Sequence, residues 1–212
     1  MTRPAPAMPS PAGSDVATAG LDVLTARERH ADELAFACAA ALQNRGGHGV
    51  TVTTHQAALN EYRHVGLVVE VIGLGEEVVA EALSEVVEAS GEAHHGLLVG
   101  QTYCGTIELR AVIKTMVDTH RYRTSGRVVV FPGSTTITGA TTAAQLLAST
   151  TIDRIQVLGH VQADPSTPLL TRDFVRPRWS EGDLVLHVQP AIGGTLVPFE
   201  TPNPTPCCAD HA

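Results

Sequence analysis

Along this chain, short apolar runs typical of β-strands alternate with segments in which apolar residues recur at helical spacing. The clearest stretch runs from Gly96 to Val130. It holds a short β-rich run at Leu97–Val99, apolar residues at helical spacing over 107–117, and a second apolar run at Arg127–Phe131. A strand, a helix and a strand within this length predict a βαβ unit, whose right-handed crossover implies a parallel sheet.

Similar patterns predict further elements on both sides of this unit. Four prolines between Pro165 and Pro190 predict irregular, extended chain after Asp164, before a late β-hairpin with a Gly-Gly pair in its turn. The expected strands are 16–26, 50–55 and 155–161, the helices 31–44, 76–89 and 141–149, and the hairpin arms 184–188 and 195–199; 65–72 is either a strand or an extended approach to the next helix.

This order of elements is typical of a flavodoxin-like, doubly wound parallel sheet with helices on both faces, here with an irregular and β-hairpin C-terminal extension. Ligands of such sheets bind beyond the carboxyl ends of the strands, at 100–106 and 132–138. The expected organisation is a flexible leader (1–14), the flavodoxin-like domain (15–163), an extended segment with the hairpin (164–200) and a Pro/Cys-rich tail (201–212).

Composition narrows the function classes. The chain has 212 residues and a formal net charge of −8, which disfavours general binding to nucleic acid or to acidic membranes. No apolar run approaches the roughly 20 residues that span a bilayer. Four cysteines without a disulfide framework favour a reduced, cytoplasmic protein. Lys114 is the single lysine beside 13 arginines, a bias typical of a GC-rich bacterial genome.

Two stretches resemble a known family. GLLVGQTYCGTIELRAVIKTMVD and RVVVFPGSTTITGATTAAQLL are similar to the strand–loop–helix segments of NAD(P)H-dependent FMN reductases. The resemblance implies a flavoprotein oxidoreductase that binds FMN, accepts hydride from NAD(P)H and passes it to an acceptor. It implies phosphate anchoring by Thr25, Arg27, Arg29 and His30, a ring wall from Thr102, Tyr103, Cys104, Gly105 and Thr106, and a backbone cradle from Gly133, Ser134, Thr135 and Thr136.

The first two loops also support a rival hypothesis. Arg27 and Arg29 could grip a phosphate, or could be solvated turn residues paired with Glu28 or Asp32. A carboxylate from Glu108 that faced a flavin phosphate would repel it. The alternative function is therefore a non-catalytic accessory or assembly subunit that has lost flavin binding.

Other candidate chemistry is sparse. The segment 133–136 could be an ordinary turn with Thr138 or Thr141 as the cap of the next helix. Cys104 is either a thiol with a lowered pKa or a packed small side chain. The ten histidines form no metal-binding spacing, so no metal and no catalytic residue is assigned. Association into a dimer through the crossover helices, and a protein partner for the tail, complete the predictions.

Overall fold

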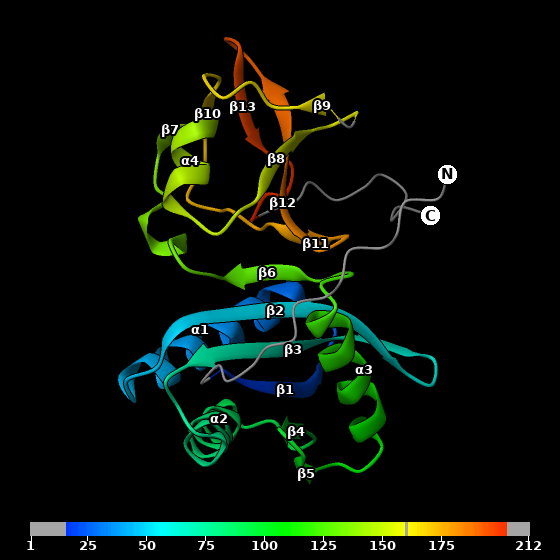
Figure 1. Ribbon diagram of the computed structural model, residues 1–212. Helices are drawn as coiled ribbons and strands as arrows, with labels where there is room; N and C mark the ends of the chain where they lie inside the picture. The colour runs from blue at the N-terminus through cyan, green and yellow to red at the C-terminus, as the bar shows by residue number, and fades with distance from the viewer. Residues whose placement is uncertain (1–15, 160, 203–212) are drawn as a thin grey trace, which may run out of the picture.

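The computed structural model describes residues 16–159 and 161–202, which form one continuous sheet with helices packed on it. Figure 1 shows two halves that meet at β6, near the middle of the molecule. The strands are β1 (Val16–Thr25), β2 (His48–Leu59), β3 (Tyr62–Ile72), β4 (Gly96–Val99), β5 (Thr102–Gly105), β6 (Arg127–Val130), β7 (Ala140–Thr142), β8 (Arg154–Val157), β9 (Val161–Gln162), β10 (Pro168–Leu170), β11 (Arg178–Ser180), β12 (Asp183–Ala191) and β13 (Thr195–Pro198). The α-helices are α1 (Glu28–Asn44), α2 (Glu76–Ser90), α3 (Leu109–Arg121) and α4 (Ala143–Ser149).

The first half has a βαββαβ order. Its strands lie in the order β4-β1-β3-β2, and every neighbouring pair is antiparallel. This is the ferredoxin-like, or split βαβ, arrangement. Helices α1 and α2 cover one face, where apolar side chains of the strands and helices form a common core. Helix α3 packs on the opposite face.

The prediction of a flavodoxin-like, doubly wound parallel sheet is wrong, because the sheet is mixed and mostly antiparallel. The difference begins at the turn between β2 and β3. Leu59 pairs directly with Tyr62, so only two residues connect the strands, and Asn60 adopts a positive φ of 55°. A two-residue turn can join only antiparallel strands. The segment before 65 is thus part of a long hairpin, and 65–72 is a strand.

The two strands of the predicted βαβ unit around α3 are not neighbours in the sheet. Strands β4 and β6 do run in the same direction, but β1, β3 and β2 lie between them. Helix α3 therefore crosses the whole face of the sheet. It packs close to the strand backbone: a Cβ atom on Gly20 would lie 2.5 Å from Cγ2 of Ile113.

The second half continues the sheet from β6 through β11, β12, β13, β10 and β7. Strands β12 and β13 pair antiparallel, so the late hairpin predicted for this region is confirmed. Strand β8 adds to β12 in parallel, and α4 begins at a capping box formed by Thr142 and Gln145. The helix cap is thus Thr142 rather than Thr138 or Thr141. A second apolar core, which includes Phe131 and Trp179, holds this half together.

Candidate functional site

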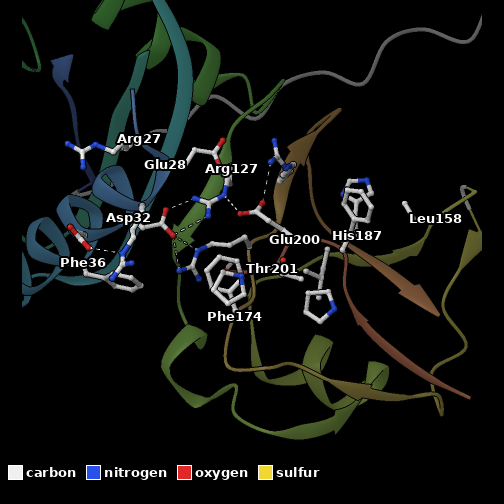
Figure 2. Close-up of a pocket in the computed structure, with 18 residues that line it drawn as sticks. Arg27, Glu28, Asp32, Phe36, Arg127, Leu158, Phe174, His187, Glu200 and Thr201 are labelled. Atoms are coloured by element: carbon white, nitrogen blue, oxygen red, sulfur yellow. Dashed lines mark hydrogen bonds and ion pairs between the residues drawn. The ribbon is translucent and has the colours of Figure 1, made fainter. Parts of the chain in front are cut away.

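A cleft of about 1130 Å³ lies where α1 faces the second half of the molecule (Figure 2). The first turns of α1 form one wall, and β12 with the chain around 198–202 forms the other. Its volume is slightly above the roughly 300–1,000 Å³ of typical small-molecule sites, so it has room for a cofactor-sized ligand. The charged residues that line it are Arg27, Glu28, Arg29, Asp32, Glu33, Arg127, Arg176, Arg178 and Glu200, and the apolar ones include Phe36, Leu158, Phe174, Leu186, Pro198 and Phe199.

A network of ion pairs crosses the cleft (Figure 2). Arg127 donates two hydrogen bonds to Asp32, at 2.5 and 3.1 Å, and its Nε donates to Glu200 at 2.5 Å. Arg176 donates from Nε to the same Asp32 at 3.1 Å, and Arg178 donates to Glu200 at 3.3 Å. Residues from α1, β6, β11 and the segment after β13 are thereby held in one constellation.

The two inner guanidinium groups are affected differently by their surroundings. Burial disfavours the charge of Arg127, but hydrogen bonds to Asp32 and the attraction of Glu200 more than compensate, so its pKa is raised. Burial and the nearby charge of Arg127 lower the pKa of Arg176, although Asp32 attracts it. Two arginines thus share one buried carboxylate, and the site depends on Asp32 for its electrostatic balance.

Aromatic side chains flank this network. The guanidinium of Arg176 lies 4.2 Å from the ring centroid of Phe174 and 5.5 Å from that of Phe36. These are distances at which a cation is attracted to an aromatic face. Phe36 is 51% exposed and Phe199 is 54% exposed, although both line the cleft. Exposed apolar surface that gathers in a concave site is typical of ligand binding.

The cleft is locally basic although the protein is acidic. Five arginines and four acidic residues line it, while the whole chain has a formal net charge of −8. Arg127 and Arg176 are paired inside the network. Arg27, at the rim, makes no side-chain hydrogen bond or ion pair within the described residues. The outer part of the cleft therefore presents cationic groups that are available to an anion.

Of the first predicted loop, only the arginines reach this cleft. Arg27 and Arg29 line it, and Arg29 pairs with Glu33 at 3.3 Å on the surface. Thr25 is buried and accepts a hydrogen bond from the backbone N–H of Arg27. His30 lies 3.2 Å from the hydroxyl oxygen of Thr25, outside the cleft lining.

The second predicted loop, 102–106, lies elsewhere. Thr102, Tyr103, Cys104 and Gly105 form β5, the outermost strand beside β4, and Thr106 follows it. The Tyr103 hydroxyl donates to the carbonyl of Thr106, and Cys104 is an exposed free thiol. Strand β5 is at the far end of the first half from β6, so this loop and the cleft are separated by the width of that sheet.

The third predicted loop, 133–136, folds back on α4. Gly133 has a φ of 87°, and Ser134, Thr135 and Thr136 form a single 3-10 turn. A Cβ atom at Gly133 would collide with the carbonyl oxygen of Ser149. The glycine is needed for this turn and for its close approach to the end of α4. The structure does not bring the three predicted loops together.

A second set of titratable side chains is buried on the α3 face of the first half. His64 Nε2 lies 2.7 Å from Asp22 Oδ2, and both side chains are fully buried. His64 Nδ1 faces the carbonyl of Tyr62 at 3.2 Å, so that nitrogen carries a proton. Burial raises the pKa of Asp22, against its hydrogen bonds from Leu24 and His64. The pair is closed off from solvent, which suits a structural role.

Glu70 and two histidines form a neighbouring cluster. His120 Nε2 lies 3.2 Å from Glu70 Oε1, and the rings of His55 and His120 are 5.9 Å apart. Burial opposes the charge of Glu70, but His120 and Arg123 lower its pKa overall. Burial and the charge of His120 lower the pKa of His55 to about 3. Within the described ranges, no three His, Cys, Asp or Glu side chains are placed to hold a metal ion.

The residues that build the cleft network were not singled out by the sequence as a site. Asp32 entered only as a pairing partner for Arg27 or Arg29, and the structure pairs it instead with Arg127 and Arg176. Glu200 lies far along the chain from Asp32. No local motif connects these positions, because the cleft is assembled from both halves. The abundance of arginine over lysine was the one available signal, since arginine is suited to buried, bidentate ion pairs.

Comparisons of the chain with family models, with curated proteins and with solved structures find no match. The fold and the site therefore define the class of protein on their own: a ferredoxin-like α/β half extended by a second β-rich half, with a charged and aromatic cleft between them. No helix in the described part of the chain is long and apolar enough to cross a membrane.

Proposed function

We propose that the protein binds an organic anion with a planar, apolar body in the cleft between α1 and β12. The observation that carries this proposal is the combination of exposed aromatic walls with a locally basic lining. Phe36, Phe174 and Phe199 offer apolar surface, and the arginines make the cleft the place where an anion is favoured.

FMN belongs to this ligand class, because it joins a planar ring to a phosphate. The predicted FMN reductase activity, with NAD(P)H as donor, stays a proposal whose support is now different. Two of the predicted phosphate ligands, Arg27 and Arg29, line the cleft, whereas the loops at 102–106 and 133–136 do not. A flavin would accordingly contact the phenylalanines of the cleft rather than a loop at the edge of a parallel sheet. A dimer, a partner for the tail and a cytoplasmic location also remain proposals; residues 203–212 of the tail lie outside the described residues.

The test is a titration with FMN, with riboflavin and with the aromatic sulfonate 8-anilino-1-naphthalenesulfonate, each followed by ligand fluorescence. We expect saturable binding of the two anions, weaker binding of neutral riboflavin, and a loss of about tenfold or more in affinity when Phe36 is replaced by Ala. Tyr122→Ala is the matched control, since Tyr122 is a 59% exposed aromatic residue outside the cleft. Equal effects of both substitutions, or no binding of any of the three ligands, would refute the proposal.

If FMN binds, oxidation of NADPH and NADH by the loaded protein is the next measurement. Turnover with an added electron acceptor supports the reductase. Tight flavin binding without turnover indicates a flavin-binding protein that is not a reductase. The absence of FMN binding supports the rival, a non-catalytic accessory or assembly subunit that has lost flavin binding.

A further inference from the structure

A second, smaller cavity of about 320 Å³ adjoins the cleft. The two share three lining residues: Glu28, Arg127 and Arg178. The side cavity lies where β6 begins, between β2 and α3. Beyond Thr54, which pairs with Arg127, β2 has no further partner on the β6 side within the described residues. The gap beside this free strand edge is what leaves the cavity open.

The lining of the side cavity holds fewer apolar side chains than that of the cleft. It carries side chains of Thr54, Gln56, Thr115, Thr119 and Ser125, with Met116 as its main apolar contribution. Among these side chains, Thr115 donates its hydroxyl hydrogen to the carbonyl of Ala111. The hydroxyls of Thr119 and Ser125 have no hydrogen bond within the described part of the chain. They are therefore free to donate to a ligand.

The charges of the side cavity favour an anion. Arg127 and Arg178 border it, but the guanidinium of Arg127 is already engaged by Asp32 and Glu200, so Arg178 is the cation open to a ligand; Glu28 carries the only carboxylate of the lining. The carboxylate of Glu28 already accepts a hydrogen bond from Gln56 at 3.2 Å. Arg178 is half exposed, and only its Nη2 is engaged, by Glu200 at 3.3 Å. The remaining N–H groups of its guanidinium can donate hydrogen bonds to an oxyanion in either cavity.

We infer that the side cavity is the subsite for the oxyanion, a phosphate or a carboxylate, of the ligand whose planar body lies in the cleft. Arg178 is the contact common to both cavities, and Thr119 and Ser125 donate the neutral hydrogen bonds. The inference rests on the proposed function, because it assigns the two ends of one ligand to the two cavities. The ligand is accordingly elongated, and its charged end lies in the side cavity beside Arg178.

The first experiment uses small oxyanions alone. Inorganic phosphate and acetate are titrated separately into the full-length protein while the backbone amide resonances of Gln56, Ser125 and Gly126 are followed. Saturable shifts at these amides are the expected result, and whichever ion produces them at lower concentration identifies the oxyanion. Shifts confined to residues of the cleft, or none at all, would overturn the subsite.

The second experiment uses the ratio of riboflavin to FMN dissociation constants, because the two ligands differ only in the phosphate. Thr119→Val combined with Ser125→Ala, and separately Arg178→Met, should each lower this ratio about tenfold, which is the scale of a hydrogen bond to a charged group. In the Thr119→Val and Ser125→Ala double variant, whose two residues lie outside the cleft lining, riboflavin affinity should stay within about twofold of the wild-type value. The matched controls are Thr138→Val and Arg121→Met, which change exposed residues outside both cavities.

The outcomes separate this inference from the proposed function. Flavin binding with an unchanged ratio in the variants refutes the subsite and leaves the cleft proposal standing. Phosphate-induced shifts at Ser125 and Gly126, with no binding of FMN, riboflavin or the aromatic sulfonate, refute the cleft proposal and leave an oxyanion site. Loss of both flavins in the double variant assigns the hydroxyls to stability rather than to binding, and this too overturns the inference.

Discussion

Replacing Asp32 by Asn should destabilise the protein strongly. The side chain is 11% exposed and accepts hydrogen bonds from both Arg127 and Arg176. The amide has the same shape but no charge, so two largely buried guanidinium groups would lose their shared counter-ion. Breaking a buried ion pair by neutralising one partner costs about 3–5 kcal/mol. We expect a loss of this size in the free energy of unfolding, a large part of the roughly 5–15 kcal/mol of a typical domain.

Urea unfolding monitored by circular dichroism measures this loss as a lower midpoint concentration of urea, provided that the dependence of the unfolding free energy on urea concentration is unchanged. Glu33→Gln is the matched control. Glu33 pairs with Arg29 on the surface, where the two side chains are 63% and 88% exposed, and such exposed pairs contribute at most about 1 kcal/mol. Arg176→Met, alone and combined with the Asp32 change, completes a cycle in which the two effects should not be additive. A loss below about 1 kcal/mol for Asp32→Asn would refute the view that the carboxylate balances the cleft.

Three further predictions concern other parts of the fold. The pKa of His55 is lowered from 6.5 to about 3, so between these pH values the unfolded chain binds a proton that the native state does not. The free energy of unfolding should therefore fall by up to about 1.4 kcal/mol per pH unit as the pH drops from 6.5 towards 3. Urea midpoints measured across this range should show this decline in the wild-type protein and lack it in His55→Gln. Gly20→Ala should cost about 1–3 kcal/mol by pressing on the β-branched side chains of α3. Gly75→Ala, with open space around it, should lose in the same assay only the fraction of a kcal/mol, at most about 1, by which Gly exceeds Ala as the N-cap of α2. Iodoacetamide should alkylate exposed Cys104 in the native protein and spare Cys38, whose pKa burial raises to about 12; peptide mass mapping that finds both modified at equal rates would contradict this packing.

The types of most elements follow from local patterns. The helical repeats at 31–44 and 76–89 correspond to α1 and α2, because an apolar stripe at a period of 3.6 residues is visible in any sequence window. The hairpin arms β12 and β13 were equally visible, since a Gly-Gly pair separates two apolar runs. Strand β5 was missed, because TYCG carries little apolar pattern and was read as a loop.

The candidate site shows the limit of this approach. Arg27 and Arg29 were singled out and do line the cleft. Arg127, Arg176 and Glu200, which form its network, stand in unrelated local patterns. Their contacts arise only after α1 and the second half have been brought face to face. Gly133 conversely resembled a flavin-binding glycine, although its close neighbour is the end of α4.

Local sequence patterns place most of the helices and the longer strands, because propensity and hydrophobic period are local properties; the short strands β5, β10 and β11 lack such a pattern. These patterns did not determine which strand lies beside which, since the same run of apolar residues is buried equally well in a parallel or an antiparallel neighbourhood. That choice was made by the two-residue turn at Asn60 and by the long crossing of α3, which place β1 and β3 in the centre. The cleft exists only because of this arrangement: the tertiary structure carries Asp32 to Arg127 and Glu200, and so turns scattered charges into one site.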